Sequence, residues 1–248
     1  MKITFLGTGT STGVPVLGCN CEVCRSEDTR DKRLRTSALI ETRGKTILID
    51  CGPDLRQQLL RAKVTKIDAV LITHFHYDHV AGLDDIRPFG EVPVYAEQNV
   101  LEQLKTTMPY CFSEKKYPGI PKIELCEISE KPFWLEDIEI QTIRVLHGSM
   151  PIFGYRINNV AYITDAKTIC ATEMNKLEKL DLLILNALRH QEHFAHFNIQ
   201  EAIAKAQELR AKQTYFVHFA HTIGKHADIQ PVLPENIFLA YDGLELQI

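Results

Sequence analysis

Residues 69–79 read AVLITHFHYDH, an apolar run that is followed at once by ligand-type side chains. The run itself is typical of a buried strand. Beyond it, His74 and His76 project to the same side of an extended chain, and Asp78 and His79 arrive from the start of the next helix. Imidazole and carboxylate groups without a thiolate suit a divalent ion such as Zn, Mn or Fe. The segment therefore predicts a metal site, with a polar surface loop as the alternative.

Four other apolar runs also end abruptly in polar residues. They are Thr46–Ile49 before Asp50, Ile138–Val145 before His147, Val160–Ile163 before Thr164 and Asp165, and Tyr215–Val217 before His218. Side chains at strand ends are held by a rigid scaffold and still face solvent, which is where sites are usually built. We therefore expect the five strand ends to share one edge of the fold.

Helical patterns lie between these runs. The strongest begins at Asn198, which forms a possible capping box with Glu201, and residues 53–61 and 172–179 are weaker helical segments. Residues 37–42 and 45–49 read as a hairpin. Strands interleaved with helices predict an α/β sandwich. No linker or composition change marks a boundary, so we expect a single domain over residues 1–248.

The composition is that of a globular chain with a sizeable core, because 45% of the 248 residues are hydrophobic and 24% are charged. With 28 Lys and Arg against 32 Asp and Glu, the net charge is −4. This balance gives no basic field to collect nucleic acid or an anionic membrane. The longest apolar runs are also too short to span a bilayer, so we expect neither kind of partner.

Three of the seven cysteines are crowded at Cys19, Cys21 and Cys24 and the others are scattered, which is not the pattern of a disulfide framework. A reducing, cytoplasmic setting with a metal at the crowded three is the better interpretation. Residues 16–19 resemble a lipoprotein cleavage site. The glycines, the proline and the polar residues of the first twenty positions argue against an export signal.

The string His74-x-His76-x-Asp78-His79 resembles the signature of the metallo-β-lactamase superfamily, and the later residues of that signature match His147, Asp165 and His218. The resemblance covers essentially the whole chain and implies a four-layer αββα sandwich that holds two divalent ions. It assigns His74, His76 and His147 to one ion, Asp78, His79 and His218 to the other, and Asp165 as the bridge.

The resemblance also implies a hydrolytic reaction. Two divalent ions lower the pKa of a shared water from 15.7 toward about 7, so that a bridging hydroxide can attack the substrate. The resemblance implies that Asp78 and Asp165 contribute to catalysis by holding the ions that activate this water. Two ions, these carboxylates and the hydroxide leave a charge of about +1, which attracts a phosphodiester. Asp50 resembles a carboxylate that orients a ligand imidazole, with a turn cap as the alternative.

Two further features resemble the phosphoribosyl cyclic phosphate phosphodiesterase (PhnP) group. In that group a Cys-x-Cys-x-x-Cys cluster and a second histidine hold a structural zinc, which here implies Cys19, Cys21, Cys24 and His221 as its ligands. Free cysteines in a loop are the alternative. His196 resembles the position that this group and ribonuclease Z use to protonate the leaving oxygen. We expect His190 and His193 to be solvated loop residues.

The predicted function is therefore that of a binuclear hydrolase of a small phosphodiester that depends on Zn, Mn or Fe, and the family resemblance implies a cyclic phosphodiester. The alternatives are a ribonuclease Z-like RNA phosphodiesterase and a lactone or thioester hydrolase. The glycine-rich residues 7–13 lack the spacing of a dinucleotide fingerprint, and we expect a tight loop near the metal edge. Five basic residues are candidates to bind phosphate, with a solvated charge as the alternative for each: Arg33, Arg35, Arg87, Arg189 and Lys225. The family resemblance also suggests a homodimer.

Overall fold

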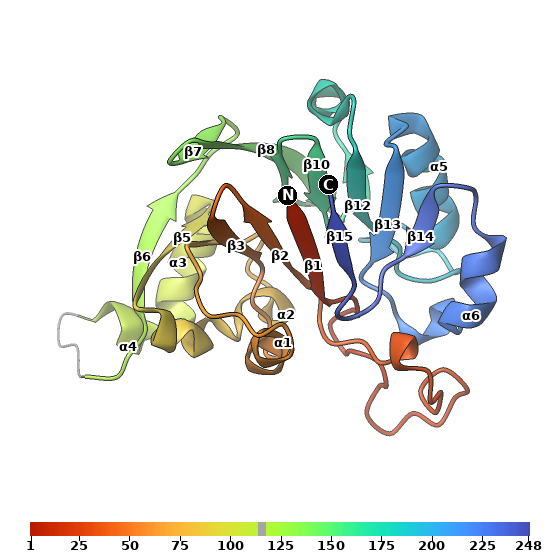
Figure 1. The fold of residues 1–248 in the computed structure, drawn as a ribbon, viewed down its shortest axis with the longest axis horizontal. Coiled ribbons are helices and arrows are strands. Elements are labelled where there is room, and N and C mark those ends of the chain that lie inside the picture. The colour runs from red at the N-terminus through yellow and green to blue at the C-terminus, as the bar shows by residue number, and fades with distance from the viewer. Residues whose placement is uncertain (114–117) are drawn as a thin grey trace.

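The computed structural model describes residues 1–113 and 118–248. Two β-sheets pack face to face, and helices cover the outer face of each sheet (Figure 1). In Figure 1 the helices on the left belong to the first sheet, and α5 and α6 on the right belong to the second. The α/β sandwich that the sequence predicts is confirmed.

The first sheet has the strand order β15-β1-β2-β3-β4-β5-β6. Its strands are β1 (Lys2–Gly7), β2 (Ser37–Thr42), β3 (Lys45–Ile49), β4 (Ala69–Leu71), β5 (Glu91–Ala96), β6 (Lys122–Glu127) and β15 (Glu245–Gln247). The pairs from β3 to β6 are parallel and those from β15 to β3 are antiparallel.

The second sheet has the order β11-β8-β9-β10-β12-β13-β14, with β7 paired to β8 outside this path. Its strands are β7 (Phe133–Leu135), β8 (Ile138–His147), β9 (Met150–Ile157), β10 (Val160–Ile163), β11 (Thr168–Ile169), β12 (Leu182–Asn186), β13 (Gln213–Val217) and β14 (Ile237–Leu239). The pairs from β10 to β14 are parallel. Since β9 is antiparallel to both β8 and β10, these two strands run in the same direction.

The helices are short, as expected for elements that connect strands. The α-helices are α1 (Leu55–Arg61), α2 (Tyr77–Val80), α3 (Gln98–Thr107), α4 (Pro109–Phe112), α5 (Ile199–Leu209) and α6 (His226–Ile229). The 3₁₀ helices are η1 (Thr29–Asp31), η2 (Leu83–Phe89), η3 (Ala171–Leu177), η4 (His221–Ile223) and η5 (Gln230–Val232). No helix in the described ranges has the length and apolar content that a membrane span requires.

Three apolar clusters separate the four layers of the sandwich. Along β3, Ile47 and Ile49 belong to the cluster between the sheets, and Leu48 belongs to the cluster beneath α1 and α3. This alternation follows from the two-residue period of a strand, and all three side chains are fully buried because both faces of the sheet are covered. Each such side chain contributes about 1.5–3 kcal/mol to the stability of the fold. The third cluster fills the space between the second sheet and α5.

The local predictions agree with the structure in most places. The hairpin forms through β2 and β3, and its turn residues Arg43 and Gly44 both have positive φ. Asn198 and Glu201 form the capping box of α5, with both hydrogen bonds at 2.9 Å. The helix expected over 172–179 was only partly correct, because the segment forms η3, a 3₁₀ helix that ends at Leu177.

Candidate metal centre

The predicted strand ends converge on one edge of the sandwich. Asp50 follows β3, Asp165 lies just beyond β10 and His218 follows β13. All three residues have left-handed backbone conformations, with φ of 58°, 58° and 63° respectively. Such conformations cost free energy in a non-glycine residue and often occur at functional sites. They turn the chain immediately after each strand.

The two sheets are also hydrogen-bonded to each other at this edge. The hydroxyl of Tyr155, in β9, donates to the carbonyl of Ile72 at 2.6 Å. The N–H of Phe153 donates to the carbonyl of Thr73 at 3.2 Å. These bonds fix the segment of residues 72–79 against the second sheet, so residues from both sheets can contribute to a single site.

The first ligand group consists of His74, His76 and His147, whose nitrogen atoms lie within 4.8 Å of one another. His74 is fully buried and lies 3.0 Å from His76, measured from Nε2 to Nδ1. Burial and the neighbouring His79 hold the pKa of His74 well below its usual value. A neutral imidazole is the form that binds a metal. The group is therefore suited to a divalent cation.

The second ligand group consists of Asp78, His79, Asp165 and His218. Asp165 Oδ1 lies 3.2 Å from His218 Nε2 and 3.5 Å from His79 Nε2. The other oxygen, Oδ2, lies 3.8 Å from His74 Nε2 in the first group. The two oxygens of Asp165 therefore face the two ligand groups separately, as a bridging carboxylate requires.

The second ligand group also has buried atoms that lack partners. His79 Nε2 and both ring nitrogens of His218 are buried and have no hydrogen bond to any described residue. Burial of an unpaired polar atom costs about 1–3 kcal/mol. Although burial opposes it, the charges of His218 and His79 hold the pKa of Asp165 well below its usual value. A carboxylate surrounded by unpaired imidazole nitrogens fits a bound cation.

Asp50 orients one of the ligands. Its Oδ2 accepts a hydrogen bond from His79 Nδ1 at 2.7 Å, and its Oδ1 accepts from the N–H of Thr73 at 2.8 Å. The bond to Nδ1 leaves Nε2 of His79 directed toward the ligand group. His147 is oriented in the same way, because its Nδ1 donates to the carbonyl of Ala195 at 3.0 Å. These contacts favour an orienting role for Asp50 over the alternative of a simple turn cap.

His196 lies beside both ligand groups. Its ring stacks on His218 at 4.9 Å and lies 4.6 Å from His147, and its Nδ1 is 3.9 Å from Asp165 Oδ2. This Nδ1 is buried, with no hydrogen bond to a described residue. Burial lowers the pKa of His196 to about 3, so the ring is uncharged at neutral pH. Its atoms are also close enough to His147 and Asp165 to form a further potential metal-binding group.

A cleft of about 440 Å³ opens over the two ligand groups. Besides His196 and five metal-ligand candidates, it is lined by Ser11, Met150, His193, Phe194 and Ala195. Ser11 belongs to the loop of residues 7–13, so this loop reaches the metal edge as expected. His193 is a partly exposed loop residue as expected, but it also lines the cleft, and its ring lies 4.9 Å from that of His196 at a tilt of 41°.

Two glycines that the sequence analysis did not single out permit the close packing of the motif. A Cβ atom on Gly52 would lie 2.1 Å from the carbonyl oxygen of Asp78. One on Gly82 would lie 2.0 Å from the carbonyl oxygen of Gly52. The segment after β3 therefore packs directly against α2, and any larger residue would displace Asp78 or His79. No pattern within the motif indicates this constraint.

The cysteine cluster forms a separate group. The Sγ atoms of Cys19, Cys21 and Cys24 lie 3.3–3.4 Å from Nδ1 of His221. The N–H of Cys24 and the His221 ring lower the pKa of Cys21 to about 6, which favours the thiolate. Burial raises the pKa of Cys24 to about 11. Three thiols that converge on one imidazole nitrogen suit a tetrahedral zinc site.

The five basic residues named as candidate phosphate ligands lie outside the cleft and interact with other groups of the chain. The expectation for Arg33 is wrong, because this residue is buried, donates to Thr8 and to the carbonyl of Ala240, and stacks on Phe219. Arg35 pairs with Asp54, Arg87 with Asp84 and Lys225 with Glu22, and Arg189 donates to the carbonyls of Gln191 and Glu192. None of the five lines the cleft over the ligand groups.

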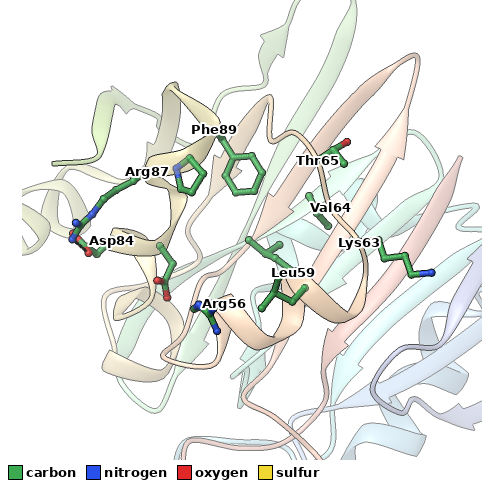
Figure 2. Close-up of a pocket in the computed structure, with 11 residues that line it drawn as sticks. Arg56, Leu59, Lys63, Val64, Thr65, Asp84, Arg87 and Phe89 are labelled. Carbon is green, nitrogen blue, oxygen red and sulfur yellow. Dashed lines mark hydrogen bonds and ion pairs between the residues drawn. The ribbon is translucent and has the colours of Figure 1, made fainter. Parts of the chain in front are cut away.

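A larger groove of about 820 Å³ lies between α1 and η2, away from the metal residues. Leu59, Val64 and Phe89 form its apolar wall, and Arg56 and Lys63 lie at its rim (Figure 2). No candidate metal ligand lines this groove. Its size alone does not assign it a function, and the two ligand groups lie at the smaller cleft.

An α/β sandwich with two groups of candidate metal ligands at one edge is the arrangement of a metal-dependent hydrolase. Comparison with known proteins identifies the family. The chain belongs to the metallo-β-lactamase superfamily, because residues 45–219 match the model of the beta-lactamase superfamily domain. This match includes the whole motif and the three later residues of the signature, His147, Asp165 and His218.

Within the superfamily, the chain is similar to the crystal structure of a new diphosphatase from the PhnP family. The TM-score is 0.93, and the sequences are 40% identical over 99% of this chain and 96% of that one. It is 46% identical over 99% of its length to a protein of Porphyromonas gingivalis named octanoyltransferase. It is also 34% identical over 63% of its length to ribonuclease Z of Bacillus thuringiensis. The chain spans about half the length of these two curated relatives, 51% and 49% respectively.

Replacing Asp50→Asn should weaken divalent metal binding by about 10–100-fold, because the amide no longer fixes the Nδ1–H tautomer of His79. The measurement is competition for Zn²⁺ or Mn²⁺ with a chromogenic chelator. Asp68→Asn is the matched control, because Asp68 also accepts from a backbone N–H, that of Thr46, at the opposite end of β3. Equal metal affinity in the Asp50 variant and the control, with both folded, would contradict the orienting role.

Proposed function

We propose that the chain is a binuclear metal-dependent phosphodiesterase that hydrolyses a small phosphodiester, in keeping with the hydrolase family to which it belongs. The observation that carries the proposal is the position of Asp165. Its Oδ1 faces His218 and His79, and its Oδ2 faces His74. Such a carboxylate suits a pair of cations, and cation pairs are common in enzymes that cleave phosphate esters.

Divalent ions held by these groups would supply an acidified water and would stabilise negative charge on phosphoryl oxygens. The chain itself holds and orients the ligands: Asp50 fixes His79, and the carbonyl of Ala195 fixes His147. Most members of the second ligand group are almost fully buried, which excludes bulk water and strengthens the electrostatic interactions. His76 and His147 are more exposed and lie on the side where substrate enters.

We assign His196 the role of holding the proton that passes to the leaving oxygen. It lines the cleft and touches both ligand groups. Its imidazole is uncharged in the resting site, because burial lowers its pKa to about 3. Negative charge on a bound phosphoryl group would raise this pKa and favour the imidazolium form. The imidazolium would then donate one proton to the leaving oxygen and return to the neutral imidazole.

The similarity to the PhnP-family diphosphatase supports a phosphorus-containing substrate, because it extends over nearly the full length of both chains. The octanoyltransferase name supports no acyl-transfer proposal here, since the chain spans only 51% of that relative. Ribonuclease Z activity and lactone or thioester hydrolysis are outcomes that the assays below distinguish. The homodimer and the cytoplasmic location stay predictions.

We also propose that Cys19, Cys21, Cys24 and His221 hold one structural zinc ion. The supporting observation is that all three sulfur atoms approach the same nitrogen of His221. The loop of residues 19–24 has no regular secondary structure, and a zinc ion would tie it to η4, just past β13. This ion would support the edge of the active site without taking part in the reaction.

The direct test of the proposed reaction is turnover of bis(4-nitrophenyl) phosphate, a chromogenic lactam and a lactone by chelated protein and after restoration of Mn²⁺ or Zn²⁺. We expect phosphodiester hydrolysis that chelation abolishes and metal restores. Turnover of an RNA precursor at a much higher kcat/KM would favour the ribonuclease alternative. Lactam or lactone turnover without phosphodiester turnover would overturn the proposal.

His196→Ala should lower kcat for phosphodiesters with alkoxide leaving groups by about 10²–10⁴-fold, because such groups need a proton. Esters with a 4-nitrophenolate leaving group should lose much less, since this group leaves unprotonated. The measurement is a plot of log kcat against the pKa of the leaving group, which should be steeper for the variant. Equal losses across the series would remove His196 from this role.

Cys21→Ser should remove about one zinc ion per chain and lower the melting temperature, because one of four ligands is lost. Turnover per folded molecule should change much less. Cys126→Ser is the matched control, since Cys126 is a partly buried cysteine in β6 outside the cluster. Elemental analysis and thermal unfolding provide the readouts. A zinc content equal to that of the control would contradict the structural site.

A further inference from the structure

The cleft contains an aromatic residue that the reaction itself does not require. Phe194 is 81% exposed, which is unusual for a side chain of this size, yet it lines the cleft together with the metal-ligand candidates. It lies in the loop between β12 and α5, two residues before His196. An exposed aromatic ring at the mouth of a polar cleft is a candidate for ligand contact.

Phe194 is the outer member of a row of four rings. Its ring lies 4.8 Å from that of His193, which lies 4.9 Å from His196, which in turn lies 4.9 Å from His218. The planes of neighbouring rings are tilted by 32°, 41° and 21° respectively. The row therefore runs from the surface to the second ligand group, and only its outer end is strongly exposed.

The Phe194 ring has neighbours on its inner side. A Cβ atom built on Gly148 would lie 3.6 Å from Cδ2 and Cε2 of the ring, an ordinary van der Waals distance, so the ring lies beside this glycine with room for a methyl group. Gly148 has a φ of 62° and directly follows the metal-ligand candidate His147. Since Gly148 and His193 lie on one side of the ring and leave most of it exposed, its outer surface is available to a ligand.

We propose that Phe194 is a specificity-determining residue that stacks on the nucleobase of a nucleotide whose phosphate binds at the two ligand groups. This inference rests on the proposed function and narrows its substrate class to small nucleotide phosphoesters. A cleft of about 440 Å³ lies within the range of small-molecule sites. Base stacking on an aromatic side chain strengthens binding by roughly 5- to 150-fold.

The composition of the cleft favours a nucleotide over an acyl chain. Among its lining residues only Met150, Phe194 and Ala195 are apolar, and the others are histidines, aspartates and a serine. An acyl chain needs a continuous apolar wall, whereas a nucleotide needs one flat apolar surface beside polar groups. The net charge of −4, and a cleft lining that includes no Arg or Lys among the described residues, also favour a small nucleotide over a long RNA.

The test compares two esters that share one leaving group, the 4-nitrophenyl ester of thymidine 5′-monophosphate and methyl 4-nitrophenyl phosphate. In the metal-loaded wild-type protein, kcat/KM should be at least about tenfold higher for the thymidine ester. Phe194→Ala should abolish this preference through KM, and Phe194→Trp should restore it. Trp134→Ala, which removes another exposed aromatic ring in β7 and outside the cleft, should retain the wild-type ratio.

The results separate the failure of this inference from the failure of the proposed function. If the ratio of the two kcat/KM values is near one in the wild-type protein, or is unchanged in Phe194→Ala, the stacking role is overturned. Hydrolysis of the methyl ester would still support the proposed phosphodiesterase activity. If neither ester is hydrolysed, the proposed function fails. Calorimetry with thymidine 5′-monophosphate and with inorganic phosphate then tests the stacking site alone. A lower affinity for the nucleotide in Phe194→Ala, but not in Trp134→Ala, supports the stacking role. An unchanged affinity in Phe194→Ala overturns it.

Discussion

The rest of the site depends on the burial of two carboxylates, Asp78 and Asp165, among histidine rings at the meeting point of the two sheets. Both side chains are largely removed from solvent, and a buried charge is costly unless opposite charge or hydrogen bonds compensate it. The rings of His79 and His218 supply part of that compensation, because their charges lower the pKa of Asp165, but His79 Nε2 and both nitrogens of His218 have no hydrogen bond to a described residue. A pair of cations would satisfy carboxylates and imidazoles together, which links the stability of this edge to metal binding.

The fold supplies this arrangement through strand direction and close packing. The strands before Asp165 and His218 are parallel neighbours of β12, so they end at the same edge of the second sheet. The motif of residues 74–79 reaches the same edge from the first sheet, where bonds to β9 hold it. Because residues 52 and 82 are glycines, the backbone after β3 packs in direct contact with the backbone at Asp78 and at Gly82. Metal ligands far apart in sequence are thereby brought within a few ångströms of one another.

Much of this could be predicted from the sequence, because apolar runs that end in ligand-type residues identify both the strands and the site. The strand before Asp50, the capping box at Asn198 and the convergence of His147, Asp165 and His218 follow from such patterns. The exposed position of Phe194 in the cleft could not be predicted, since a single phenylalanine in a polar loop has no periodicity and its exposure depends on how residues 187–198 pack. The burial of Arg33 likewise depends on tertiary contacts with Thr8 and Phe219.

The left-handed residues at 50, 165 and 218 have a consequence for how proteins of this shape can diversify. Because the residue that bears the functional group has a left-handed backbone conformation, the chain leaves the strand direction at that residue and the connection that follows departs from the sheet. Insertions or deletions further along these connections would then alter the outer walls of the cavity and leave the reactive centre in place. A common catalytic frame can in this way acquire new selectivity through changes in loop length alone.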